Sequence, residues 1–207
     1  MSKVIGLFPT PLLLKEKALD NQLVERLKRR ALAGRKDSNA GTDLLSHTEM
    51  VDPDGDEVFR DVSAAVVDDI QKFGMLMFGD QLDWRVKEMW LNVLEHGGSQ
   101  FMHTHANSFM SGIVYLTHQD ASSRTLFQRQ VGTGEFVFRH DGRDDMASDF
   151  TAERWVVPEV QPGDLVLYPS HLLHGVPPNQ GQQRMTLALN AIPSRLKSFG
   201  YEIKFSR

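Results

Sequence analysis

Two histidines one residue apart, His103 and His105, come directly before "FMSGIVYL", a run typical of a buried strand. In an extended chain, residues i and i+2 project to the same face, so both imidazoles would point to one place. A His-x-His pair alone fits either a metal site or two surface histidines near a turn. Because the chain has no cysteine, any metal must be held by histidine, aspartate or glutamate.

A third histidine, His174, follows the turn and apolar strand "PGDLVLYPS", and Arg184 comes ten residues after it. The turn Pro-Pro-Asn-Gln-Gly between them favours a hairpin, which would place His174 and Arg184 on neighbouring strands. An arginine in the apolar run "RMTLALN" is costly unless it meets an anion, and a carboxylate matches its planar fork. Together these residues offer three imidazoles and an arginine that lacks a carboxylate.

Four other histidines stand alone near predicted turns, where a solvated or structural role is favoured. They are His47, His96, His118 and His140.

Two helices are predicted ahead of the histidines. From Asp20, a favoured N-cap type, apolar residues recur at Leu23, Val24, Leu27, Ala31 and Leu32. A second stripe runs through Val58, Val62, Val66, Ile70, Phe73 and Met77, with Gly79 able to end the helix. Met75 and Met77 are expected to fill the core.

After Gly79 the chain changes to short apolar runs bounded by glycine, proline or asparagine. The runs are "EMWLNVLEHGG", "FMSGIVYL", "TLFQRQVGTGEFVF", "RWVVPEVQPGDLVLYPS" and "RMTLALNAIP". This pattern predicts a mainly β fold with some α (α+β), a sandwich or jelly roll with helices packed outside it. The acidic stretch "HDGRDDMASDF" is expected to be a loop or lid between strands. With no repeat or linker, a single domain over residues 1–207 is predicted.

Net charge and the length of the apolar runs limit the partners and the location that we expect for this chain. A net charge of −4 gives no electrostatic case for bulk nucleic-acid binding, although a pocket for one base stays open. The first residues lack the apolar run of a signal peptide, and no run reaches the ~18 apolar residues of a membrane helix. We therefore expect no membrane association and a cytoplasmic location, with homodimerisation as the default assembly.

The chain resembles the Fe(II)- and 2-oxoglutarate-dependent oxygenases of the double-stranded β-helix (cupin-like) fold. Within that superfamily it is most similar to bacterial and phage oxygenases whose substrates are undefined. The residues that carry the resemblance are "LFPTP" (7–11), Trp90-Leu91-Asn92, Gly97, His103-Thr104-His105, Ser111-Gly112, Tyr115-Leu116, "PGDLVLYPS", His174, Pro178-Asn179, Arg184 and Asn190. It implies mostly helical support over residues 1–80 and a double-stranded β-helix core over 81–207.

The resemblance also implies roles for single residues. His103 and His174 would be metal ligands, and Arg184 would bind the distal carboxylate of 2-oxoglutarate with help from Thr186. Asn92 stands where AlkB-type demethylases have a co-substrate-binding asparagine. Tyr115 is a further candidate for this pocket, although a core role suits it equally.

His105 departs from the superfamily, which usually has aspartate or glutamate at this position to complete its facial triad. Three interpretations follow. His105 ligates Fe(II), which is the interpretation we favour because the chain resembles a group that also has His-x-His. Alternatively, a carboxylate from elsewhere, such as Glu95 or Asp120, takes the third position. The last alternative is zinc, which three imidazoles and a water suit well.

The function that the resemblance implies is a dioxygenase that couples oxidative decarboxylation of 2-oxoglutarate by O₂ to C–H oxidation of an unknown small-molecule or side-chain substrate. AlkB-like demethylation is favoured by Asn92 but disfavoured by Asn190, where those enzymes have a second arginine, and by the acidic net charge. Two alternatives stay open. One is a cupin-like three-histidine dioxygenase that does not use 2-oxoglutarate. The other is a catalytically inactive protein that binds metal or carboxylate.

Overall fold

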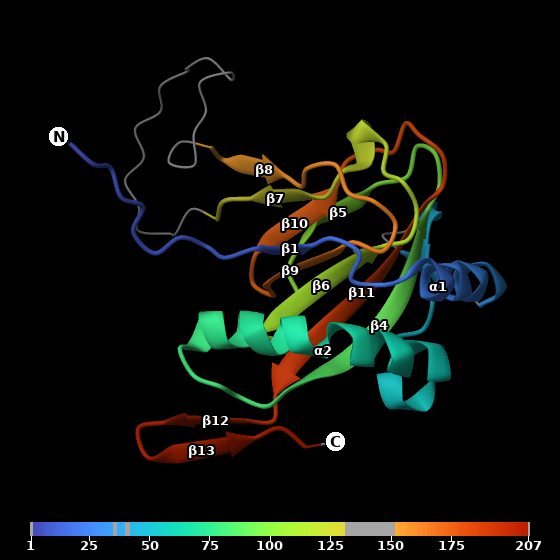
Figure 1. Cartoon of the computed structure of the whole chain (residues 1–207). Coiled ribbons are helices and arrows are strands. Elements are labelled where there is room, and N and C mark those ends of the chain that lie inside the picture. Colours follow the sequence, from blue (N-terminus) through green and yellow to red (C-terminus); the bar gives the residue numbers. More distant parts are fainter. Residues whose placement is uncertain (1, 35–36, 40–41, 131–151, 207) are drawn as a thin grey trace.

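The computed structural model describes residues 2–34, 37–39, 42–130 and 152–206. The predicted loop "HDGRDDMASDF", His140 and part of the run "TLFQRQVGTGEFVF" lie outside these residues. Two antiparallel sheets face each other and two helices cover the outer face of the larger one (Figure 1).

The larger sheet has seven strands, and most of its neighbours are far apart in the sequence. In spatial order they are β1 (Leu13–Lys15), β9 (Leu165–Pro169), β6 (Met110–Tyr115), β11 (Arg184–Pro193), β4 (Trp84–Leu94), β3 (Thr42–His47) and β2 (Asp37–Asn39). The smaller sheet has the order β5 (Gln100–His103), β10 (Leu173–Val176), β7 (Leu126–Gln128) and β8 (Arg154–Val156). A terminal hairpin pairs β12 (Arg195–Ser198) with β13 (Tyr201–Lys204). The mainly β prediction is confirmed, with the jelly-roll pairing of two sheets.

Both predicted helices form where expected. The helix α1 spans Asn21–Ala33, and its N-cap Asp20 accepts a hydrogen bond from the Leu23 amide at 2.8 Å. The helix α2 spans Glu57–Phe78 and ends at Gly79, whose φ of +67° lies in the left-handed region that glycine adopts without strain. Short 3-10 turns occupy Pro53–Gly55 and Ala121–Ser123.

Two details of the helix prediction are wrong. Leu32 is 57% exposed and Met75 is 51% exposed, so neither side chain fills the core. Each follows the apolar stripe in the sequence by one or two positions, where the helix has already turned its surface toward solvent.

Strand alternation divides the large sheet into two faces. On β11, Met185, Leu187 and Leu189 pack in one apolar cluster with α1 and α2. The residues between them, from Arg184 to Asn190, face the smaller sheet, so the same strand supports the core and presents polar groups to the interior. A second apolar cluster between the sheets contains Tyr115 and Tyr168.

Candidate metal centre

Three histidines from two neighbouring strands converge at one end of the smaller sheet. His103 ends β5, His105 lies two residues beyond it, and His174 lies in β10 directly opposite His103 in the ladder. Their candidate ligand nitrogens all lie within 4.8 Å of one another. Of the ranges that the structure describes, this is the one group of at least three His, Asp or Glu side chains with that spacing.

Backbone carbonyls fix the tautomer of two rings. The Nδ1 of His103 lies 2.8 Å from the Phe101 carbonyl oxygen, and the Nδ1 of His174 lies 2.8 Å from the Leu172 carbonyl oxygen. Because a carbonyl oxygen only accepts, each Nδ1 donates its hydrogen, and each Nε2 keeps a lone pair for another partner. This arrangement orients both Nε2 atoms as metal-ligand groups.

Burial favours the neutral form of His105 and His174. Desolvation, followed by the nearby His103, lowers the pKa of His105 to about 4 and that of His174 to about 3. Glu88 acts in the opposite direction and raises the pKa of His105, so a negative charge lies near the cluster. Neutral imidazole is the form that binds a metal ion.

The donor set fits a divalent transition metal. The Nε2 atoms of His105 and His174 lie 3.2 Å apart. Two imidazole nitrogens bound at ~2.1 Å to one ion, at angles of about 90–109°, would lie ~3.0–3.4 Å apart. Three imidazole ligands suit iron, zinc, copper or nickel, and do not suit magnesium or calcium.

The two carboxylates suggested as replacements for His105 lie elsewhere. Glu95 accepts a hydrogen bond from Gln183 at 2.7 Å, and Asp120 caps the turn at Ala121–Ser123 on the surface. Neither joins the histidine group. His105 is therefore the described side chain that stands in the third position.

Arg184 begins β11 in the same interior and is buried. Its Nε donates to Gln119 Oε1 and its Nη2 donates to Thr125 Oγ1 at 3.2 Å. Its guanidinium carbon lies 5.8 Å from the centre of the Tyr115 ring. All of these partners are neutral and no described carboxylate pairs with it, so burial lowers the pKa of Arg184 while the cationic form lacks a counter-ion. A carboxylate ligand would supply that counter-ion.

Six predicted residues line one cavity between the sheets: His103, His105, His174, Arg184, Thr186 and Asn92. The Oδ1 of Asn92 is buried with no hydrogen-bond partner, as expected of a polar atom whose partner is a ligand. Tyr115 does not line this cavity. It is fully buried in the core, and its hydroxyl lies 3.0 Å from Thr125 Oγ1, so it supports a neighbour of Arg184.

The expected hairpin between His174 and Arg184 is wrong. The strand β10 belongs to the smaller sheet and β11 to the larger one, so the intervening turn crosses from one sheet to the other. The two side chains line the same cavity from facing sheets instead of lying side by side in one sheet. A proline-rich turn of this length suits both connections, and only the pairing of the whole sheets separates them.

Sequence reasoning missed three polar residues of the site. The Tyr168 hydroxyl lies 2.9 Å from His174 Nε2, and burial raises the pKa of Tyr168 well above its usual value, so a protonated phenol lies beside the lone pair that a metal ion would take. Gln119 and Thr125 hold Arg184. Tyr168 looks in the sequence like one more apolar strand residue, and the other two lie in an irregular segment with no motif.

The part of the chain that contains this site matches a known family. Residues 88–190 match the profile of the family described as "Putative 2OG-Fe(II) oxygenase", and this range contains all three histidines and Arg184. Residues 88–190 belong to the 2OG-Fe(II) oxygenase family. A search of curated protein sequences found no match.

Solved structures of other oxygenases share the fold of this one. HygX from Streptomyces hygroscopicus, solved with nickel and 2-oxoglutarate, is 14% identical with a TM-score of 0.63, over 89% of this chain and 84% of HygX. A prolyl-4-hydroxylase from Pseudomonas putida is 19% identical with a TM-score of 0.59, over 88% and 92%. The carbocyclase SnoK from nogalamycin biosynthesis is 17% identical with a TM-score of 0.64, over 90% and 81%.

The oxygenase is thus an oxidoreductase with the jelly-roll fold, and its cofactors are Fe(II) and 2-oxoglutarate with O₂ as co-substrate. None of the helices in the described ranges is long and apolar enough to cross a membrane.

Proposed function

We propose that this oxygenase binds Fe(II) through His103, His105 and His174, binds the distal carboxylate of 2-oxoglutarate through Arg184, and hydroxylates a C–H bond of a substrate at the mouth of the same cavity. The observation that carries the proposal is that the three imidazoles and a buried arginine without a counter-ion line one cavity.

The chemistry supplied by bound Fe(II) with 2-oxoglutarate is an oxygenation, in which R–H and O₂ become R–OH while 2-oxoglutarate becomes succinate and CO₂. The protein supplies position and charge. Two ring Nδ1–H groups bonded to carbonyls hold their imidazoles in place. Thr125 and Gln119 hold the guanidinium of Arg184 so that it can form a bidentate pair with a carboxylate. Thr186 and Asn92 add polar groups to the same pocket.

His105 makes the metal-ligand set neutral, where an aspartate would make it anionic. Glu88 restores part of that charge through space, since it raises the pKa of His105. We infer that His105 is a ligand of an active iron site and does not mark a site that has lost its activity.

The test is an anaerobic titration of the Fe(II)-loaded protein with 2-oxoglutarate, followed in visible light for a metal-to-ligand charge-transfer band. We expect the band in the wild type and its loss in Arg184→Ala. His96→Ala is the matched control, because His96 is exposed and bonds only to the Gly181 carbonyl. Loss of the band in the control, or its survival in Arg184→Ala, would contradict the proposal.

Turnover separates the proposal from its two alternatives. With O₂, the wild type should form succinate. Consumption of a chelating substrate and O₂ without 2-oxoglutarate would point to a cupin-like three-histidine dioxygenase. Binding of 2-oxoglutarate with no succinate in any substrate screen would point to a binding protein. A cytoplasmic location and a homodimer stay predictions from the sequence.

A further inference from the structure

A second cleft opens beside the three histidines and has a volume of about 360 Å³. Its lining includes His47, Trp90, Gln100 and Asn190 as well as His103 and His105. Glu88 is the one carboxylate among its described lining residues, and no lysine or arginine is among them. Glu88 is therefore the carboxylate that this cleft presents next to the candidate metal centre.

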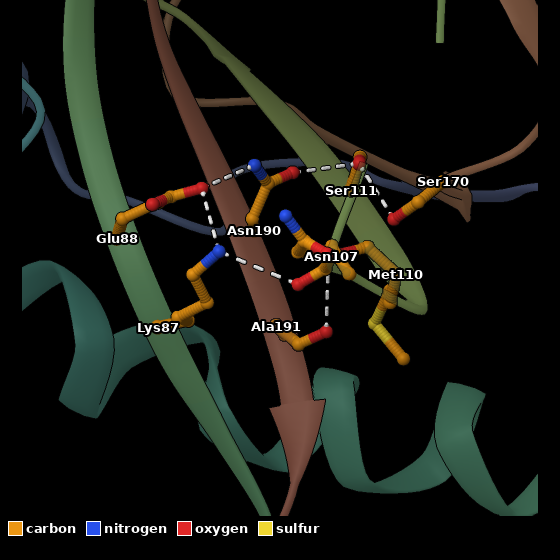
Figure 2. Close-up of polar contacts among 9 residues, drawn as sticks. Lys87, Glu88, Asn107, Met110, Ser111, Ser170, Asn190 and Ala191 are labelled. Atoms are coloured by element: carbon orange, nitrogen blue, oxygen red, sulfur yellow. Dashed lines mark hydrogen bonds and ion pairs between the residues drawn. The ribbon is translucent and has the colours of Figure 1, made fainter. Parts of the chain in front are cut away.

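Glu88 is held from one side only. Its Oε1 accepts a hydrogen bond from Asn190 Nδ2 at 2.8 Å, and the ammonium of Lys87 lies 3.3 Å from the same oxygen (Figure 2). Within the described ranges, no side chain or amide donates to Oε2. A carboxylate in a cleft thus keeps one oxygen for a further partner.

Behind Glu88 runs a chain of buried hydrogen bonds across three strands and the end of a fourth (Figure 2). Asn190 must donate to the carboxylate, so its Oδ1 faces Ser111 Oγ and accepts from it at 2.7 Å. The single hydroxyl hydrogen of Ser111 is used there, so Ser170 Oγ donates to Ser111 Oγ at 2.9 Å. Every donor in the chain points toward Glu88, which fixes the orientation of its carboxylate.

Such a chain is costly to bury. Ser111, Ser170 and Asn190 are at most 3% exposed, and apolar residues would fill the same sheet positions without the cost of desolvation. Ala188, one inward-facing position away from Asn190 on β11, illustrates the cheaper choice. The network is explained if the orientation of Glu88 matters to the function.

Glu88 lies at the end of the interior opposite Arg184. Along β11, Arg184 and Asn190 both face inward and are six residues apart, which is about 20 Å of strand. The strand β4 runs antiparallel to it and places Asn92 opposite Thr186 and Glu88 opposite Asn190. His103 and His105 line both cavities, so they lie between the arginine end and the carboxylate end.

We propose that Glu88 is a substrate-recognition residue, positioned by Asn190, Ser111 and Ser170, and that the substrate carries a protonated amine that pairs with it. This inference rests on the proposed function, because it places the amine on the side of the metal centre opposite the 2-oxoglutarate carboxylate. Trp90, which lines both cavities with its ring centre 5.7 Å from that of His105, offers an apolar wall for the carbon next to the amine.

The test measures binding without turnover, in protein loaded with Ni(II) and saturated with 2-oxoglutarate. The probes are benzylamine, benzyl alcohol and benzoate, which share one ring and differ in charge. We expect benzylamine to bind about tenfold more tightly than benzyl alcohol, since a charge-assisted hydrogen bond replaces a neutral one, and benzoate to bind least. Equal binding of the amine and the alcohol would overturn the proposal.

Glu88→Gln removes the charge and keeps the shape and the acceptor for Asn190. We expect this variant to bind the amine and the alcohol equally, while it still binds 2-oxoglutarate and loses less than about tenfold in Ni(II) affinity, which is the effect of the Glu88 charge through space. Glu95→Gln is the matched control, because Glu95 lies outside the cleft lining, and it should keep the tenfold preference. A preference that survives Glu88→Gln would refute the role of Glu88. A loss of Ni(II) affinity of tenfold or more in Glu88→Gln, the size expected on removal of a ligand, would make Glu88 a metal ligand and equally refute its role in recognition.

The two proposals fail separately in this experiment. If 2-oxoglutarate binds and the amine preference is absent, the recognition role is wrong and the proposed function stands. If 2-oxoglutarate does not bind, the proposed function is wrong, whatever the probes do.

Discussion

Arg184→Met is the most informative single substitution, because it separates a ligand-binding arginine from a structural one. Burying the guanidinium costs several kcal/mol. Its hydrogen bonds to Gln119 and Thr125 return about 3–6 kcal/mol, and the Tyr115 ring returns about 1–2 kcal/mol. These contributions nearly cancel, and methionine keeps most of the buried apolar stem. We therefore expect the free energy of unfolding without ligand to change by no more than about 1 kcal/mol.

Addition of 2-oxoglutarate should stabilise the wild type much more than Arg184→Met. At 100 times its dissociation constant, 2-oxoglutarate stabilises the wild type by about 2.7 kcal/mol, which raises Tm by roughly 5–11 °C for a chain of this size. Loss of a buried carboxylate partner costs 2–5 kcal/mol of binding, so a hundredfold weaker affinity leaves the variant about 0.4 kcal/mol of stabilisation, or roughly 1 °C. The assay is thermal unfolding of Ni(II)-loaded protein with and without 2-oxoglutarate, together with urea unfolding for the free energies.

Arg85→Met is the matched control. Arg85 lies on β4 near the far end of the β4–β11 pair, opposite Ile192, and donates to the Phe205 carbonyl, so the 2-oxoglutarate shift should persist there. A loss of 3–5 kcal/mol in ligand-free Arg184→Met would show that Arg184 is a structural residue. A full 2-oxoglutarate shift in that variant would show that another group binds the carboxylate.

Three further predictions follow from the site and the helices. In the metal-free protein, the pKa values of His105 and His174 are lowered, so between pH 6.5 and about 4 the unfolded chain binds protons that the folded chain does not. The free energy of unfolding should therefore fall by roughly 2 kcal/mol per histidine from pH 7.5 to 5. Urea midpoints at the two pH values check this, and equal midpoints would contradict it. His105→Ala should weaken Ni(II) binding by at least tenfold in a competition titration, whereas an unchanged affinity would remove His105 from the ligand set. Asp56→Ala removes the cap that accepts from the Val58 amide at 2.9 Å and should cost α2 about 1 kcal/mol, read as a lower urea midpoint with an unchanged slope; no loss would show that the cap is not used.

The sequence predicted residues whose chemistry depends on local spacing. His103 and His105 are linked by the two-residue repeat of an extended chain, and Arg184 with Thr186 by the same repeat on β11. Both helices follow from a cap, a stripe and a terminal glycine. The predicted hairpin after His174 was wrong, because a turn sequence does not specify in which of the two sheets the next strand pairs.

The hydrogen-bonded chain from Glu88 through Asn190 and Ser111 to Ser170 could not be predicted from the sequence, for a related reason. Its hydrogen bonds join residues 102, 79 and 59 positions apart, and each bond depends on the strand order β4-β11-β6-β9. Glu88 looks in the sequence like an ordinary polar strand residue, and Ser111 drew attention only as part of Ser111-Gly112, which carries the family resemblance. In the sequence, Asn190 drew attention only because AlkB-type demethylases have an arginine at this position. In the structure, its side chain donates to the carboxylate of Glu88.

That difference at Asn190 bears on the kind of substrate. An arginine there would present a cation to the cleft and favour an anionic substrate such as a phosphate backbone. Here the position is neutral and supports Glu88, so the cleft offers an oriented negative charge instead. The same charge acts on the metal centre, because Glu88 favours positive charge at His105. In the proposed site, one carboxylate would thus both compensate for the missing anionic ligand and select the proposed cationic substrate, which accounts for a neutral third ligand next to a cleft that contains Glu88.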